Sequence, residues 1–293
     1  MLEVSGLTKI YREGRGVKDL SFRVDSGTAF GFLGPNGAGK TTTIRLLMGF
    51  MKPDLGSAVI HGLDCWQDRA ELKRFVSYLP GELHFMERLT GFEFLELIEG
   101  MHGENYEIQR NRDALMDALE LNPRQAIRKM SKGMKQKLGI ISALMLNSQV
   151  LILDEPTSGL DPLMQKTFVE LILEEKKKGK TIFMSSHQFS EIEKTCEKVG
   201  IIREGELLAV QDITLLKKNE RQTFEVEVEG EEDADVLRQS GLALYPIGGF
   251  YFTVLIEGQQ DLLWKTLAQI RVKRFKQGSL ELEEAFMHFY RSS

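Results

Sequence analysis

The stretch Gly34-Pro35-Asn36-Gly37-Ala38-Gly39-Lys40-Thr41 decides the fold of this chain. It fits the pattern G-x-x-x-x-G-K-[ST], a loop whose backbone N–H groups surround phosphate oxygens. The apolar run Ala29–Leu33 before it predicts a buried strand, and Thr42–Met48 after it predicts a helix whose N-terminus adds further donors. Lys40 would supply a point charge for the β- and γ-phosphates, and Thr41 a hydroxyl for Mg²⁺. The sequence therefore predicts a nucleotide-binding site.

Two other interpretations of this glycine-rich stretch are open at the level of sequence. Gly37-Ala38-Gly39 begins the G-x-G of a dinucleotide-binding fold, but Thr42 stands where the third glycine of that motif belongs. An ordinary glycine-rich turn is the simplest alternative. The complete motif, set between a predicted strand and a predicted helix, favours the phosphate-binding loop over both.

Composition limits the classes of protein to which the chain can belong. Its 293 residues are 42% apolar, enough for one large domain and one smaller domain. The net charge of −5 does not suggest a nucleic-acid-binding protein. Cys65 and Cys196 are expected to be buried or incidental thiols in a reducing compartment. We expect no signal peptide and no membrane span, because neither a charged-then-apolar N-terminus nor a run of about 18 apolar residues is present.

Strands alternate with helices over residues 1–220, which predicts an α/β domain with a mostly parallel sheet. Val150–Leu153 and Thr181–Met184 are short apolar strands of the kind that a parallel sheet buries on both faces. The first 30 residues alternate like antiparallel strands. Between about residues 83 and 146 the apolar period becomes helical, with capping-box spacing from Thr90 to Glu93, and predicts a helical insertion.

Residues 221–293 are predicted to form a second, small α+β domain. The order of predicted elements is β-α-β-β-α-β, a split βαβ unit that ends with a helix over Leu280–Tyr290. The region holds 8 basic and 12 acidic residues, a net charge of −4, so it lacks the positive surface that DNA or RNA requires.

Two adjacent carboxylates follow the strand Val150–Leu153. Asp154 is placed to hold the Mg²⁺ that Thr41 also binds, and Glu155 to orient or deprotonate a water that attacks the γ-phosphate. A simple strand end with a helix-capping role is the alternative. Further upstream, Ser131 opens a helix; it is an N-cap residue on the simpler interpretation and, with Gly133, part of an anion site on the other.

The order of these motifs resembles the ATP-binding subunits of ABC transporters over about residues 1–215, especially bacterial exporters with separate ATPase and permease chains. The resemblance implies an ABC-type P-loop NTPase fold with ATP and Mg²⁺ as ligands. Glu155, His187 and Lys40 match the catalytic positions of that family, and Ser158–Asp161 matches its inter-protomer loop. Residues at matching nucleotide-contact positions are Tyr11 (on adenine), Gly34, Pro35, Asn36, Gly37, Ala38, Gly39, Lys40, Thr41, Thr42, Ser131, Gly133 and Met134.

The sequence departs from the family pattern at two positions. Lys132 stands where the first of two signature glycines is usual. Gly81 occupies the place of a glutamine that contacts Mg²⁺ and the attacking water. Two replacements for the glutamine stay open: Glu82 as a metal ligand beside Thr41 and Asp154, or a contact through water.

The resemblance also implies partners. Two ATPase chains, identical or related, would pair head to tail, and an integral-membrane permease would dock on the helical region at the cytoplasmic face of the cell membrane. The alternative is a soluble ABC ATPase acting on nucleic acid or the ribosome, but the chain has no long coiled-coil insertion, second ATPase domain or basic stripe. The absence of an N-K-x-D motif argues against a GTPase. The transported substrate is not encoded in recognisable residues, and the direction of transport follows from the resemblance alone.

Overall fold

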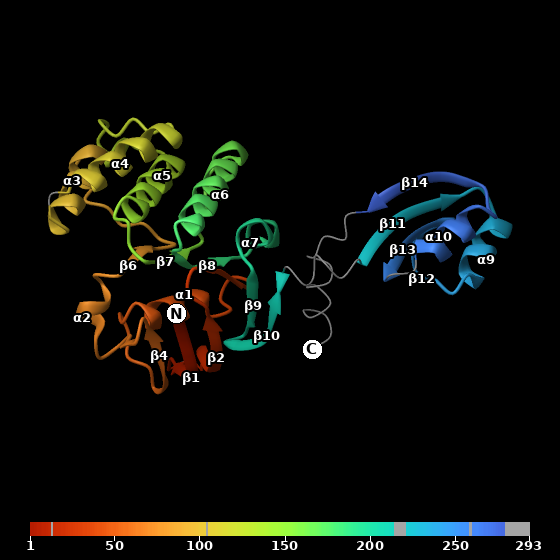
Figure 1. The fold of residues 1–293 in the computed structure, drawn as a ribbon, viewed down its shortest axis with the longest axis horizontal. Helices are drawn as coiled ribbons and strands as arrows, with labels where there is room; N and C mark the ends of the chain where they lie inside the picture. The colour runs from red at the N-terminus through yellow and green to blue at the C-terminus, as the bar shows by residue number, and fades with distance from the viewer. Residues whose placement is uncertain (13, 104, 214–220, 258–259, 279–293) are drawn as a thin grey trace. The chain divides into compact units, whose positions relative to one another are not determined.

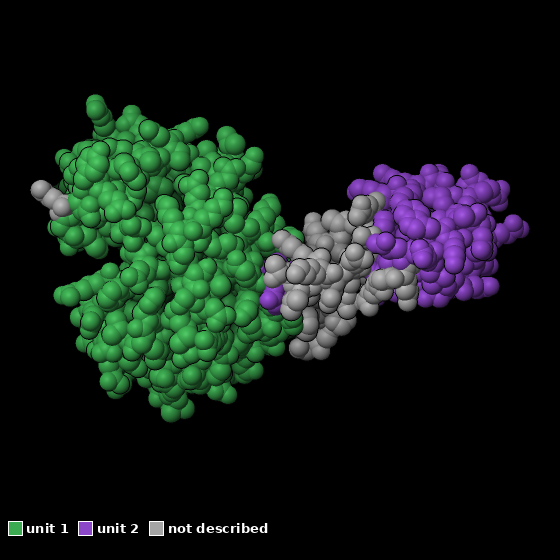
Figure 2. Space-filling view, viewed as in Figure 1, with its two compact units in different colours: residues 1–211 green, residues 212–293 purple. Residues whose placement is uncertain are grey.

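The computed structural model describes residues 1–12, 14–103, 105–213, 221–257 and 260–278. It divides into two compact units, Met1–Gln211 and Asp212–Ser293, which Figure 2 shows in different colours. The predicted domain border after residue 220 lies at the end of a stretch, 214–220, that is outside the described residues.

A six-stranded sheet forms the centre of the first unit, in the order β10-β9-β3-β8-β7-β6. The pairs β9–β3, β3–β8, β8–β7 and β7–β6 are parallel, as the short apolar runs predicted. All residues of β3 and β7 are buried, because helices and a second sheet cover both faces. Its strands are β3 (Ala29–Leu33), β6 (Val76–Leu79), β7 (Val150–Asp154), β8 (Thr181–Ser186), β9 (Lys198–Arg203) and β10 (Glu206–Asp212).

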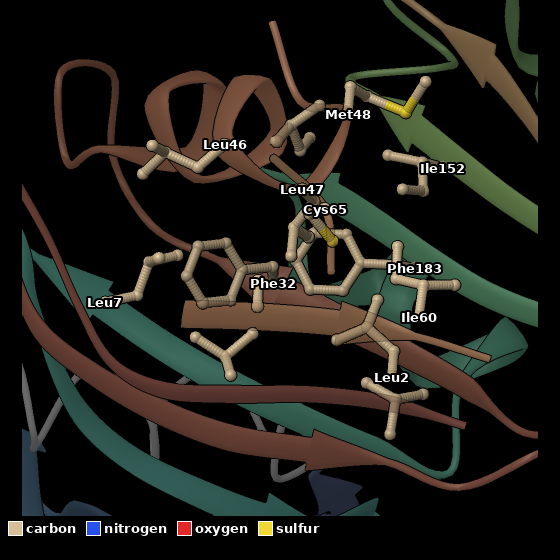
Figure 3. Packing of buried hydrophobic residues seen from close by; sticks show 14 of the residues in the cluster. Leu2, Leu7, Phe32, Leu46, Leu47, Met48, Ile60, Cys65, Ile152 and Phe183 are labelled. Carbon is tan, nitrogen blue, oxygen red and sulfur yellow. The ribbon is translucent and has the colours of Figure 1, made fainter. Parts of the chain in front are cut away.

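A four-stranded antiparallel sheet, ordered β2-β1-β4-β5, packs with the central sheet around a shared core. Phe32 and Phe183 lie in this core with ring centroids 5.3 Å apart, and α1 (Lys40–Leu47) contributes Leu46 and Leu47 (Figure 3). The antiparallel strands predicted near the N-terminus are thus confirmed. The strands are β1 (Leu2–Ile10), β2 (Gly16–Val24), β4 (Leu55–Ile60) and β5 (Leu63–Asp64), and the short helix α2 (Arg69–Leu72) follows them.

The helical insertion consists of α3 (Gly91–Met101), α4 (Tyr106–Ala118) and α5 (Lys132–Leu144), which lie together in Figure 1 with the 3₁₀ turn η1 (Ile127–Lys129) before α5. The predicted capping box is present: Thr90 accepts from the backbone of Glu93, and the Glu93 carboxylate accepts from the Thr90 N–H. Helices α6 (Pro162–Lys177) and α7 (Phe189–Thr195) follow β7 and β8. None of the helices in the described part of the chain combines the length and apolarity that a membrane crossing needs.

The second unit has the predicted β-α-β-β-α-β order and a four-stranded antiparallel sheet ordered β12-β13-β11-β14. Alternate residues of β11, Phe224, Val226 and Val228, enter its own core under the two helices. The elements are β11 (Arg221–Val228), α9 (Glu231–Gln239), β12 (Ala243–Gly248), β13 (Tyr251–Glu257), α10 (Gln260–Leu267) and β14 (Val272–Gly278). The terminal helix predicted over Leu280–Tyr290 lies outside the described residues.

Candidate functional site

The phosphate-binding loop connects the end of β3 to the start of α1, at the carboxyl edge of the parallel sheet. Its backbone requires glycine at particular positions. A Cβ on Gly34 would lie 2.4 Å from the carbonyl oxygen of Ile202, and Gly39 has a φ of 108°, in the left-handed region. Gly37 also has a positive φ, of 82°, with open space around it. The backbone at Gly34 and Gly39 is therefore packed tightly against neighbouring residues, whereas Gly37 borders open space.

The side chain of Lys40 turns back into this loop. Its Nζ donates to the carbonyl oxygens of Gly34, at 2.6 Å, and Pro35, at 3.1 Å. It also lies 3.0 Å from Oε1 of Glu155, and the residue is only 5% exposed. A buried ammonium group is thus held where the loop would enclose phosphate oxygens, which is the placement that the motif predicts.

Asp154 ends β7 with one carboxylate oxygen engaged and the other free of donors. Oδ1 accepts a 2.5 Å hydrogen bond from Ser185, which is its register partner on β8. Oδ2 is buried and has no hydrogen-bond partner. Such an orphaned anionic oxygen is costly unless a cation meets it, so it fits a Mg²⁺ ligand.

The remaining ligands of such a cation would come mostly from outside the protein. Among the described residues, no group of three or more His, Cys, Asp or Glu side chains gathers into a metal cage. Mg²⁺ is typically held by one or two protein oxygens together with phosphates and waters. Asp154 at the end of β7 and the hydroxyl of Thr41 in the first turn of α1 are the residues that fit this pattern.

Glu155 bridges the loop lysine and His187. Its Oε2 is in hydrogen-bond contact with Nδ1 of His187, while its Oε1 faces Lys40. Its backbone has a φ of 49°, a left-handed conformation that costs a non-glycine residue about 1–3 kcal/mol. Hydrogen bonds from its N–H to the Ser185 carbonyl and hydroxyl, at 3.2 and 3.1 Å, hold it there. The backbone thus directs this carboxylate toward Lys40 and His187.

At the position of the missing glutamine, the structure puts Gly81 against the carboxylate of Asp154. A Cβ there would be 3.3 Å from both Cγ and Oδ2 of Asp154. Glu82 is exposed, and among the described residues no hydrogen bond joins its carboxylate to Asp154. Nearby, burial raises the pKa of Tyr78 to about 12, with a further contribution from the negative charge of Asp154.

Tyr11 lies beside the start of α1, as an adenine-stacking residue would. Its hydroxyl is 3.5 Å from Oγ1 of Thr42 and 3.4 Å from the Met51 sulfur. The ring remains 36% exposed. A half-open aromatic face next to the phosphate loop is compatible with stacking on a base.

The signature residues lie at the N-terminus of α5, apart from the phosphate loop of the same chain. Ser131 caps the helix and accepts from the N–H of Met134 at 3.2 Å. A Cβ on Gly133 would be 2.9 Å from the Gly159 carbonyl oxygen, and the stem of Lys132 packs over Gly159. Within the described part of the chain, no hydrogen bond or ion pair joins Ser131, Gly133 or Met134 to Lys40. The N-cap interpretation is confirmed.

Two polar residues of the site were missed by the sequence argument. Ser185 holds both Asp154 and Glu155, and Glu191 on α7 is buried next to Ser186. The only sequence signal for Ser185 was its place beside His187 at the end of an apolar strand. The signal for Glu191 was weaker still, because a glutamate on a short helix is usually solvated.

Comparison with known proteins gives consistent results. A family model described as ABC transporter matches residues 17–158. The bacitracin transport ATP-binding protein BcrA of Bacillus licheniformis is 38% identical over 82% of this chain and 78% of its own length. The linearmycin resistance ATP-binding protein LnrL of Bacillus subtilis is 34% identical over 72% of this chain and 68% of its own. A solved ATP-binding subunit of an ABC transporter, 32% identical, superimposes with a TM-score of 0.69 over 74% of this chain and 92% of that chain.

Proposed function

Because this chain belongs to the ATP-binding subunits of ABC transporters and is therefore an ATPase that powers transport, we propose that it drives export through a separate membrane permease, as a head-to-tail dimer that encloses ATP. The observation that carries the catalytic part of this proposal is the position of Glu155 between Lys40 and His187. One carboxylate there meets both a buried cation and an imidazole, at the edge of the sheet where the phosphate loop lies.

The site residues have distinct roles in this proposal. Lys40 exchanges its carbonyl partners for the β- and γ-phosphate oxygens of ATP. Glu155 orients the attacking water and accepts its proton at a carboxylate oxygen, while His187 fixes that carboxylate and contacts the γ-phosphate. Thr41 and Asp154 hold Mg²⁺, which neutralises charge on the phosphates when it is bound. Glu82 belongs to this shell only through a water or a movement of its loop, since its carboxylate is exposed.

Dimerisation is proposed from the position of the signature residues. Ser131, Gly133 and Met134 sit at a helix N-terminus whose N–H groups and dipole favour an anion. Within one chain Gly133 packs on Gly159, and among the described residues no hydrogen bond or ion pair joins Ser131, Gly133 or Met134 to Lys40. In a head-to-tail pair, this helix end of one protomer would face the γ-phosphate bound to the other. The partner is a second copy of this chain or a related ATPase.

Export and the permease are proposed from the relatives and from the helical insertion. BcrA is described as a bacitracin transport protein and LnrL as a linearmycin resistance protein, which are the functions of export systems. The permease would dock on the insertion, about Leu83–Leu121, and on the loop Glu82–Arg88, where Met86 is 57% exposed. This places the chain at the cytoplasmic face of the cell membrane.

Replacing Glu155 with Gln tests the catalytic assignment. The amide cannot take a proton, so we expect ATP hydrolysis to fall by at least about 100-fold while ATP binding is kept. With ATP and Mg²⁺ the variant should accumulate as a dimer, measured by light scattering. Glu174→Gln, an exposed glutamate on α6, is the control and should behave as the wild type. A Glu155→Gln protein with undiminished turnover would overturn the assignment.

A further inference from the structure

The proposed mechanism leaves one buried carboxyl group near the site without a role. Glu191, in the first turn of α7, is 7% exposed. Its Oε2 accepts a 2.7 Å hydrogen bond from the hydroxyl of Ser186, and its Oε1 is buried without a hydrogen-bond partner. Burial disfavours the charged form of a carboxyl group, so we expect a glutamate at this buried position to have a specific role.

Its partner, Ser186, shapes the turn that carries His187. The Ser186 hydroxyl donates to Glu191 and accepts from the N–H of Gln188 at 3.0 Å, so it bridges the residues on both sides of the histidine. The Ser186 carbonyl accepts from the N–H of Gly34 at 3.3 Å, which ties the same residue to the phosphate loop. A displacement of Ser186 would therefore move the histidine relative to the nucleotide site.

Glu191 also faces the segment that leads from Glu155 to the signature helix. The hydroxyl of the buried Thr157 favours the charged form of Glu191 and so lowers the pKa of its carboxyl group. The carbonyl of the preceding Pro156 accepts a 2.6 Å hydrogen bond from the buried amide of Gln136 on α5. Glu191 thus lies between the His187 turn and the Pro156–Thr157 segment. The hydrogen bond from Gln136 connects that segment to α5, the helix that begins with the signature residues.

The protonation of Glu191 agrees with a hydrogen-bonding role. Burial raises its pKa to about 7, although the hydroxyls of Ser186 and Thr157 oppose that rise. The charged groups that face it are Glu155, which raises the pKa further, and His187, which lowers it. A substantial fraction of the molecules therefore carries a neutral carboxylic acid here at neutral pH.

We propose that Glu191 is a positioning residue of the ATPase: its carboxyl group holds Ser186, and through it the turn that presents His187 to Glu155. The proposal rests on the roles assigned above to Glu155 and His187. The function lies in the hydrogen bond and in the length of the side chain, not in a negative charge. Glutamine, which has the shape of the protonated acid, should substitute for it, whereas alanine and the shorter aspartate should not.

Kinetics separate positioning from simple stabilisation. We expect Glu191→Ala to lower kcat by at least about tenfold, since sub-ångström to ångström displacements of catalytic groups cost 10–100-fold. The Kd for ATP should change less than about threefold, because Glu191 does not touch the phosphate loop. Glu191→Gln should keep most of the wild-type kcat, and Glu191→Asp should resemble the alanine variant.

Two further variants keep the test decisive if Glu191→Ala is unstable. Ser186→Ala removes the other half of the hydrogen bond, so its kcat should fall similarly and the double variant should be no worse than either single one. Glu175→Gln is the matched control: Glu175 is also 7% exposed but pairs with Lys178 and Lys180, so only thermal stability should change. An unchanged kcat in Glu191→Ala, or a Glu191→Gln variant as slow as the alanine one, would refute the proposal.

A spectroscopic readout distinguishes failure of this proposal from failure of the proposed function. The ¹⁵N signals of the five histidines can be recorded without turnover, and His187→Ala identifies the one of interest. The Nδ1 signal of His187 should keep its hydrogen-bonded position in Glu191→Gln and leave it in Glu191→Ala. A signal that is unmoved in Glu191→Ala contradicts the positioning role, even if Glu155 proves essential for hydrolysis.

Discussion

At Gly81 the backbone passes directly beside the carboxylate of Asp154. The family pattern has a glutamine at this position. Glycine lacks not only the glutamine amide but also a Cβ. Any Cβ here would lie 3.3 Å from Oδ2, which is tighter than an ordinary van der Waals contact, and Oδ2 is the oxygen left without a donor. The absence of a side chain at Gly81 therefore leaves room for the Asp154 carboxylate, the proposed Mg²⁺ ligand.

Gly81→Ala should weaken Mg²⁺ binding, because the added methyl group presses on Asp154. We expect roughly a three- to tenfold rise in the Mg²⁺ concentration needed for half-maximal hydrolysis, equivalent to about 1 kcal/mol. Binding of ATP without Mg²⁺ should be unchanged. Gly100→Ala is the control, since a Cβ on that helical glycine meets nothing within 4 Å. Equal Mg²⁺ dependence in both variants would contradict this account of Gly81.

Residue types and spacing were enough to predict which side chains come together at the candidate site. The loop lysine, Asp154, Glu155 and His187 do lie together, because the parallel strands that carry them end at one edge of the sheet. Ser185 and Glu191 could not be predicted in the same way. Their contacts depend on the register between β7 and β8 and on how α7 packs, which are tertiary facts without a local sequence signal.

Among the elements, α3 and α4 are joined by a buried ion pair. Arg112 donates to Glu99 at 2.9 Å and lies over the ring of Phe92 at 4.9 Å, while Gln109 donates to the second oxygen of Glu99. Glu99 is 5% and Arg112 8% exposed, so the charge of Glu99 depends on Arg112 for compensation, while Arg112 also pairs with Asp113 at 3.0 Å. The pair fixes the geometry of the insertion on which we expect the permease to dock.

Arg112→Ala should loosen this insertion, because it leaves Glu99 buried and unpaired. We expect a loss of about 3–5 kcal/mol in the local stability of α3 and α4, seen as faster amide hydrogen exchange in those helices. Lys135→Ala is the comparison: its pair with Glu87 spans 3.4 Å and the Glu87 side chain is 66% exposed, so its loss should cost less than about 1 kcal/mol. Similar exchange rates in the two variants would argue against a structural role for the buried pair.

Helices and strands with a strong local sequence signal were predicted more accurately than those without one. The strands β3, β7 and β8 and the capped helix α3 were predicted within a few residues, because each has an apolar run or a cap of its own. The elements α7, β9 and β10 were missed. α7 is a short helix and β10 is half-exposed, whereas β9 is buried and pairs in parallel with β3. The split βαβ order of the second unit was recovered because its alternation is regular.

On the scale of the whole molecule, one chain holds only half of each proposed catalytic site. The phosphate loop, Glu155 and His187 meet within a chain, whereas among the described residues no hydrogen bond or ion pair joins Ser131 or Gly133, at the start of α5, to Lys40. The account therefore predicts that hydrolysis depends on a second protomer. Each chain is expected to bind ATP by itself, whereas only the dimer is expected to hydrolyse it.

The most direct test measures ATPase rate per chain against protein concentration, with the mass in solution recorded at each point. The account predicts that the rate per chain falls on dilution while ATP binding persists, and that it follows the fraction of dimer. A rate per chain that stays constant while every molecule is a monomer would contradict it.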